Sequence, residues 1–359
     1  MALLANARAC FHHRSTREPP AEPGRLPTLK SEASIASVAW TRQPFRLQPR
    51  FVHRVWGGNR FHADDGPIGE AWLVHEENQI SSGRATGMTL ADATRLGGQA
   101  LLGKALWDTG ERDFPLLVKL IDAAEWLSIQ VHPDDALAAE LLGPGSRGKT
   151  EAWYAIEAEP GAEIIAGTTP GTTPGDLARS IREGTIESIV ERMTFRSEDV
   201  IGLPAGTIHA LGPGVFLYEI QQSSDTTYRV FDWNRPSTAE RPLHLEESLR
   251  AIDPNLRPKP ARVGDGGDGE LMEIVSMAPF VLSRCRVERR SLQLETHDNT
   301  FFVATVIAGA ARIDCAGEIH RLDTFDSVVI PAAARSSRIS GNPAATVLVA
   351  SPHKQTSEG

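Results

Sequence analysis

Two polar side chains alternate with apolar ones in a short stretch, residues 128–135, that reads SIQVHPDD. In a strand, residues i and i+2 point to the same face, so Gln130 and His132 would project together while Ile129 and Val131 face the opposite side. Either that face meets water or the pair holds a ligand. Taken alone, Gln130 reads as a satisfied polar residue, and a histidine before a proline is more often a turn or core residue than a ligand.

Two further segments carry groups that suit the same chemistry. Glu151 leads into a strand-like run in GKTEAW (148–153), and His209 follows a Pro-x-Gly turn in LPAGTIHALGPG (203–214). Two histidines, a carboxylate and a carboxamide oxygen are donor types that suit a divalent metal, and the weak amide donor would leave the metal a stronger Lewis acid. The spacing leaves open whether the four side chains converge.

A third segment, YEIQQSSDTTYRVFDWNR (218–235), is rich in charge, with Glu219, Asp225, Arg229, Asp232 and Arg235. A hairpin with one solvated face would have the same composition. The functional interpretation places an arginine and a carboxylate at the mouth of a barrel. Lys119, Lys149 and Arg229 would then supply positive charge for an anionic ligand.

The elements that must position these groups are short strands joined by turns. The first half predicts strands at 116–123, 127–133, 152–158, 163–167, 199–206 and 216–222, and the second half at 280–295, 300–315, 326–332 and 346–351. Helical periodicity occurs at 88–98, 134–143 and 175–193. The pattern predicts a mostly β protein built of barrels or jelly rolls with a small helical insertion.

The chain divides by composition into four parts. Residues 1–40 offer little apolar surface and are predicted to be a disordered leader, with a transit peptide or an over-extended start codon as alternatives. Residues 41–255 carry all the candidate groups and the insertion near 172–195. The run 256–270, rich in Pro, Gly and Asp, is a predicted linker. Residues 271–353 read as a C-terminal scaffold domain.

The overall charge and the cysteines exclude several classes of protein. The 46 acidic and 37 basic residues give a net charge of −9, which argues against a general nucleic-acid binder. The three cysteines form no CxxC pair, so a disulfide framework or a thiolate metal site is not expected, and a reducing, cytoplasmic location is. No apolar run approaches the roughly 20 residues of a membrane span. No oligomeric state follows from the sequence.

Several motifs, in this order along the chain, resemble those of type I mannose-6-phosphate isomerases, which are zinc enzymes of the cupin superfamily: LLVKLIDAAEWLSIQVHPDD, GKTEAWYAI, LPAGTIHALGPG and EIQQSSDTTYRVFDW. QVHPDD followed by K-T-E is specific to that family, whereas PAGTIHA is shared more widely among cupins. WGGNRF (56–61) and GPIGEAW (66–72) also resemble the family's N-terminal segment. The resemblance covers residues 45–352 and is strongest over 115–235.

The resemblance implies two cupin-type jelly-roll barrels and one Zn²⁺ per chain, with ligands at Gln130, His132, Glu151 and His209. It also implies catalytic roles for Arg229, Lys149 and Glu219, and it places Lys119 and Ser128 in the substrate-binding wall. Two turns depart from the cupin pattern. Glu198 precedes Asp199 where cupins often carry glycine, and LDTFDSVVIPA (322–332) lacks the usual glycine.

The implied reaction is the interconversion of mannose 6-phosphate and fructose 6-phosphate, a step of carbohydrate metabolism with a small sugar phosphate as substrate. The metal would polarise the substrate's carbonyl oxygen, and Arg229 would add positive charge where the enediolate develops. Glu219 and Lys149 are both candidates for the base. Two rivals are a cupin oxygenase with a redox metal and a sugar-binding cupin without activity.

Overall fold

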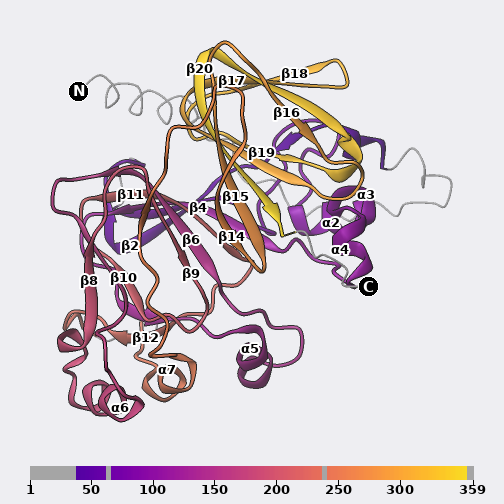
Figure 1. Cartoon of the computed structure of the whole chain (residues 1–359). Coiled ribbons are helices and arrows are strands. Elements are labelled where there is room, and N and C mark those ends of the chain that lie inside the picture. The colour runs from indigo at the N-terminus through magenta and orange to yellow at the C-terminus, as the bar shows by residue number, and fades with distance from the viewer. Residues whose placement is uncertain (1–37, 62–65, 237–240, 354–359) are drawn as a thin grey trace.

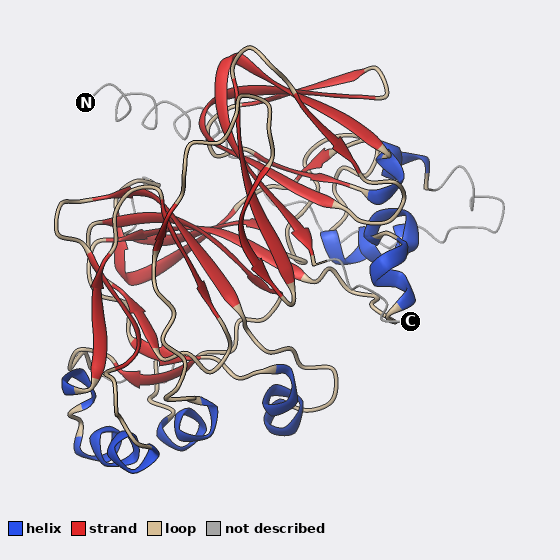
Figure 2. Cartoon of the chain, in the orientation of Figure 1, coloured by secondary structure: helices blue, strands red, loops and turns tan. Residues whose placement is uncertain are grey.

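The computed structural model describes residues 38–61, 66–236 and 241–353. β-Strands dominate it and form three sheets (Figures 1 and 2). Two sheets come from residues 50–262, and the third comes mainly from residues 272–352. The expectation of a mostly β fold is therefore confirmed, whereas the number of jelly rolls and the domain boundaries stay predictions. No helix in the described ranges has the length and apolar character of a membrane span.

The central sheet has seven strands, and its core strands are buried on both faces. In spatial order it comprises β13 (Ala261–Arg262), β9 (Asp199–Leu203), β6 (Glu151–Ala158), β11 (Val215–Gln222), β4 (Leu116–Ala123), β2 (Arg50–Gly58) and β3 (Ile68–Val74). All eight residues of β4 are buried. Val118 and Leu120 pack toward the C-terminal part, and Ile121 packs into the interior between the first two sheets. Lys119 projects to that same interior face because side chains alternate along a strand.

The second sheet has five short strands: β12 (Tyr228–Phe231), β5 (Ile129–Val131), β10 (His209–Leu211), β7 (Glu163–Thr168) and β8 (Val190–Thr194). Its outer face packs against α6 (Pro174–Glu183), α7 (Leu245–Ala251) and the loops beside them through a cluster that includes Val131, Ile181 and Tyr228. The other face meets the seven-stranded sheet across a core that contains Trp153 and Leu203. The candidate polar groups lie between these two sheets.

The third sheet has eight strands: β1 (Phe45–Arg46), β19 (Ser327–Ile330), β17 (Phe302–Cys315), β20 (Ser336–Pro352), β15 (Phe280–Val287) and β14 (Met272–Met277), with β16 (Leu292–Glu295) on β20 and β18 (Glu318–Leu322) on β17. β1 comes from the N-terminal end of the described chain, and Phe45 pairs with Val329. Phe45 is 2% exposed. The C-terminal sheet thus includes residues from the segment 41–255, which carries the candidate groups.

The remaining helical elements are short: η1 (Ala39–Arg42), α2 (Leu90–Gly97), α3 (Gln99–Leu102), α4 (Lys104–Asp108), α5 (Asp135–Leu142), η2 (Ile186–Ser188) and η3 (Ala332–Ala334). Thr89 caps α2 and Asp134 caps α5 by accepting backbone N–H groups, as such residues do at helix starts. The predicted helix over 175–193 is wrong in its second half. Gly184, at φ 69°, ends α6, and residues 190–194 pair with β7 as an edge strand.

The structure adds detail at two predicted boundaries and at the two turns that lack the cupin glycine. Trp40, 8% exposed, and Thr41, 1% exposed, are buried, so packed residues begin at the end of the predicted leader, residues 1–40; residues 1–37 of that leader lie outside the described residues. The predicted linker contains β13, which extends the seven-stranded sheet. The two turns without the expected glycine place Glu198 and Phe325 at φ 68° and 72°, the left-handed region that glycine enters most easily.

Candidate active site

One row of side chains crosses four strands of the seven-stranded sheet. Trp153 on β6 is in register with Glu219 on β11, which is in register with Lys119 on β4, and Lys119 faces Trp72 on β3. Directly paired residues share a face, so these four side chains form a continuous polar and aromatic strip on the inner side of the sheet. Lys119 Nζ lies 3.1 Å from Glu219 Oε1, and Trp153 Nε1 donates to Glu219 Oε2 at 2.9 Å.

A second row crosses three strands of the five-stranded sheet and lies opposite the first. Arg229 on β12 pairs with Gln130 on β5, and Gln130 pairs with His209 on β10. Gln130 and His132 project from the same face of β5, as the alternation in SIQVHPDD predicts. The registers therefore bring groups together that are far apart in the sequence.

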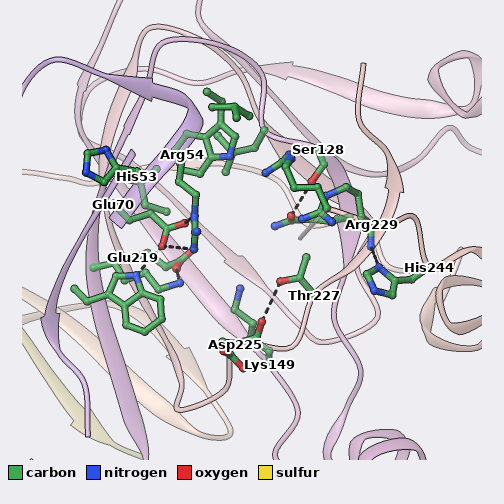
Figure 3. A pocket seen from close by; sticks show the side chains of 18 of the residues that line it. His53, Arg54, Glu70, Ser128, Lys149, Glu219, Asp225, Thr227, Arg229 and His244 are labelled. Carbon is green, nitrogen blue, oxygen red and sulfur yellow. Dashed lines mark hydrogen bonds and ion pairs between the residues drawn. The ribbon is translucent and has the colours of Figure 1, made fainter. Parts of the chain in front are cut away.

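A cavity of about 460 Å³ lies between the two rows. In Figure 3, Arg54, Glu70 and Glu219 stand on one side of it, and Ser128, Thr227, Arg229 and His244 on the other. The cavity is lined by His53, Arg54, Val55, Trp56, Glu70, Trp72, Lys119, Ile121, Leu127, Ser128, Gln130, Lys149, Trp153, Glu219, Asp225, Thr227, Arg229, Arg241, Pro242 and His244. Six of the nine site residues predicted from the sequence are among them: Lys119, Ser128, Gln130, Lys149, Glu219 and Arg229.

The other three candidates form a cluster beside this lining. The ligand atoms of His132, Glu151 and His209 all lie within 4.8 Å of one another, and the three side chains are buried. His132 Nε2 is 3.3 Å from Glu151 Oε2, and His209 Nε2 is 3.3 Å from Glu151 Oε1. Gln130 Nε2 is 3.3 Å from His209 Nε2. The four side chains proposed as metal ligands therefore lie together in the fold.

Hydrogen bonds on the far side of each imidazole define which nitrogen carries the proton. Nδ1 of His132 lies 2.8 Å from the carbonyl oxygen of Thr226, and Nδ1 of His209 lies 2.8 Å from that of Thr207. A carbonyl only accepts, so each Nδ1 must donate, and in the neutral ring Nε2 keeps its lone pair. Burial, reinforced by Lys149, lowers the pKa of His132 to about 3, and burial also lowers the pKa of His209. Both rings are neutral at pH 7.

This donor set fits a divalent cation. Two imidazole lone pairs and a carboxylate converge in a buried space, which is unfavourable without positive charge between them. Burial alone would raise the pKa of Glu151, but Lys149 and the two histidines outweigh it and hold that pKa well below its usual value. Apart from the contacts with Lys149 and the two histidines, neither oxygen of Glu151 receives a hydrogen bond within the described part of the chain. The cation nearest to them is Lys149, whose Nζ is 2.9 Å from Glu151 Oε2 and 3.0 Å from His132 Nε2.

The opposite wall carries a network that the sequence analysis did not assign. Glu70 accepts from Arg54 Nε at 2.9 Å, from Arg54 Nη2 at 3.3 Å and from Trp72 Nε1 at 2.6 Å. Burial alone would raise the pKa of Glu70, but Lys119 and Arg54 bring it down to about 2. Glu70 and Trp72 lie in GPIGEAW, which resembles the family, but Arg54 lies before WGGNRF, and strand alternation without register gives no reason to join Arg54 to Glu70.

Arg229 lies at the edge of the cavity with part of its guanidinium group unused. Nη1 donates to the carbonyl oxygen of Pro242 at 2.9 Å, whereas Nε is buried and has no hydrogen-bond partner among the described residues. Burial, followed by the positive charge of Arg241, lowers the pKa of Arg229. Asp232 does not line the cavity; it holds Arg235 and Arg241 by ion pairs of 3.0 and 2.8 Å.

Comparison with known proteins places the chain in a family. A protein-family model described as phosphomannose isomerase type I, catalytic domain, matches residues 45–170. The mannose-6-phosphate isomerase of Streptococcus mutans is 32% identical over 314 residues, which cover 84% of this chain and 96% of that protein. The chain belongs to the mannose-6-phosphate isomerase family. The mannose-6-phosphate isomerase ManA of Bacillus subtilis is 31% identical over 305 residues, which cover 81% of this chain and 94% of ManA.

Solved structures agree with this assignment. The crystal structure of the Bacillus subtilis mannose 6-phosphate isomerase superposes with a TM-score of 0.69 at 27% identity, over 86% of this chain and 99% of that one. A zinc-bound mannose 6-phosphate isomerase shares the fold, with a TM-score of 0.68 at 16% identity over 86% of this chain and 99% of that one. The protein is an isomerase, and neither the oxygenase nor the inactive sugar-binding alternative finds support among these relatives.

Proposed function

We propose that this mannose-6-phosphate isomerase uses one Zn²⁺ ion, bound by Gln130, His132, Glu151 and His209, to interconvert mannose 6-phosphate and fructose 6-phosphate. When bound, the ion would act as a Lewis acid on the oxygen next to the reacting carbons. Gln130 ligates through Oε1, which requires its amide to be turned, because Nε2 now faces His209. The predicted cytoplasmic location and the predicted absence of a nucleic-acid partner stay predictions.

The observation that carries this proposal is the pair of imidazole–carbonyl hydrogen bonds. By holding both Nδ1 protons on backbone oxygens, they aim the two Nε2 lone pairs at one point beside Glu151. Backbone carbonyls in this position fix the tautomer and the ring orientation of metal-binding histidines. A cluster that served only the stability of the core would gain nothing from two lone pairs facing a carboxylate.

Different residues then stabilise the developing negative charge and act as the base. Arg229 presents a permanent positive charge to the oxygen on which negative charge develops. Between the two candidates for the base, the contacts favour Lys149. Both oxygens of Glu219 are already occupied by Lys119 and Trp153, so Glu219 holds Lys119 in place. The atoms that contact Lys149 are those that a metal would take, which frees Nζ to reach the substrate.

The test is a metal titration combined with an isomerase assay. The purified protein should contain about one zinc ion per chain, chelation should abolish the conversion of mannose 6-phosphate, and added zinc should restore it. His209→Ala should lose more metal affinity than Gln130→Ala, because imidazole is the stronger donor. His320→Ala is a matched control, since His320 lies on β18 in the C-terminal sheet. Full activity in a metal-free sample would rule the proposal out.

A further inference from the structure

The metal cluster lies beside the cavity at its β6 side, and the Arg54–Glu70 pair lines the cavity at its β2–β3 side. Trp153 and Trp72 stand at the two ends of the four-strand row, and neighbouring strands are about 4.8 Å apart, so β6 and β3 are separated by roughly 14 Å. β3 runs antiparallel to β6. Glu70 is therefore level with Ala155, four residues along β6 from Glu151.

A hexose 6-phosphate, like this cavity, has two chemically different ends. Its reacting carbons, C1 and C2, lie at one end of the molecule and its phosphate dianion at the other. If C1 and C2 are at the metal cluster, as in the function proposed above on which this inference rests, the phosphate must lie away from Glu151. The far side of the cavity needs a positively charged group with unused donors.

Arg54 has these properties. Nε and Nη2 are held by the two oxygens of Glu70, in a side-on pair that fixes the plane of the guanidinium group. Nη1 forms no hydrogen bond with any group in the described ranges of the chain. Both side chains line the cavity, but that of Arg54 is 34% exposed and that of Glu70 only 9%, so the arginine is the more accessible of the two.

Glu70 is itself held from two directions. Trp72 Nε1 donates to Oε2, and the low pKa of Glu70, about 2, keeps it charged throughout the physiological range. A buried carboxylate with three donors has little freedom to rotate, so it holds Arg54 in one orientation before any ligand arrives. Such preorganisation lowers the entropy lost when an anion binds.

We propose that Arg54 binds the phosphate group of the substrate and that Glu70 is the positioning residue that orients it. The pair thereby selects phosphorylated over free sugars, while Arg229 and the metal cluster act on the reacting end. Arg54 is then a specificity-determining residue that contributes to binding in the ground state and in the transition state alike.

The experiment compares Arg54→Met with Arg50→Met in steady-state kinetics. Arg50 lies on the same strand and pairs with a glutamate, Glu77, at 2.6 Å, but it does not line the cavity. Losing a hydrogen bond to a charged group costs about 10- to 100-fold in binding, so KM for mannose 6-phosphate should rise by about that factor in Arg54→Met while kcat stays within about twofold. Arg50→Met should leave both constants unchanged.

Binding of inorganic phosphate, measured by calorimetry, is the second readout and does not depend on turnover. Arg54→Met should weaken it by about the same factor, and Glu70→Gln should weaken it less, because the arginine stays but loses its orientation. Arg54→Lys keeps the charge and the ion pair, so it should lie between the wild type and Arg54→Met; it also serves if the methionine variant melts early.

Unchanged KM and unchanged phosphate affinity in Arg54→Met would overturn the inference, as would a fall in kcat at constant KM. These outcomes differ from a failure of the proposed function, in which the zinc-loaded wild type itself would not convert mannose 6-phosphate. In that case the phosphate titration still decides whether Arg54 binds an anion.

Discussion

Replacement of Arg229 by lysine separates charge from geometry at the reacting end of the cavity. Nη1 of Arg229 already donates a hydrogen bond to the carbonyl oxygen of Pro242, and the buried Nε has no hydrogen-bond partner among the described residues. Lysine keeps the positive charge but has a single nitrogen. It cannot hold Pro242 and present a second donor to the substrate in the same plane.

The magnitude follows from which state of the substrate the lost donor serves. Gln130, the neighbour of Arg229 across β5 and β12, is a proposed metal ligand, so Arg229 lies next to the oxygen that becomes negatively charged. Removal of one preorganised donor to an oxyanion costs about 10²- to 10³-fold in kcat. We expect kcat of Arg229→Lys to fall about 10²-fold, and KM to change little because the contact strengthens only in the transition state.

The assay is the steady-state conversion of mannose 6-phosphate by the purified, zinc-loaded variant, with the metal content measured in the same sample. Arg250→Lys is the matched control, because Arg250 is a half-exposed residue of α7 that pairs with Glu140 outside the cavity. A rise in KM at constant kcat would show instead that Arg229 holds the phosphate, and the division of roles between Arg229 and Arg54 would be refuted.

Three further outcomes test the fold and its electrostatics. Gly103→Ala should lower the free energy of unfolding by about 3 kcal/mol or more, because the new Cβ would meet the Asn299 carbonyl oxygen at 2.3 Å. Gly110 has a similar φ of 92° but no atom within 4 Å of a new Cβ, so Gly110→Ala should cost only about 1 kcal/mol. Urea unfolding measures both, and equal losses would contradict the prediction. The stability that charged Glu70 contributes is complete above about pH 4.5 and is lost as the pH falls toward its folded pKa of about 2. Over this pH range, the melting temperature of Glu70→Gln should therefore fall less than that of the wild type. Equal falls in the two melting temperatures would count against the network. A chain that starts at Val38 should keep the melting temperature of the whole protein, whereas one that starts at Gln43 loses buried Trp40 and should melt about 5 °C or more lower; a large loss in the first chain would disprove the leader prediction.

The sequence predicts most strands of the central sheet because their patterns leave few alternatives. LLVKLIDA is buried along its whole length in β4, and a largely apolar run of eight residues that follows Pro115 is short for a helix. The edge strand β8 was missed for the opposite reason. Only Val190 of VERMT is buried, so the segment carries no clear strand pattern of its own; it is a strand because it pairs with β7, and its residues fit an amphipathic helix equally well.

The candidate site shows the same limit at the level of side chains. His132, Glu151 and His209 have residue types with few roles other than metal binding once they occur together, so motifs identify them. Arg54 and Glu70 are common surface residue types, and their pairing depends on the register between β2, β3 and β4. Register is set by tertiary contacts across the whole sheet, which no local pattern contains.

The pairing of β1 with β19 constrains the order in which this protein is completed on the ribosome. Phe45 emerges early, yet the strand that covers it, β19, is synthesised only after the two sheets around the cavity have left the ribosome. Because chains fold N-terminal parts first during synthesis, the early segment must wait with an apolar residue and an unpaired strand edge exposed. β1 can pair with β19 only late in translation. We expect the exposed segment to need chaperone binding most in the interval before that pairing forms.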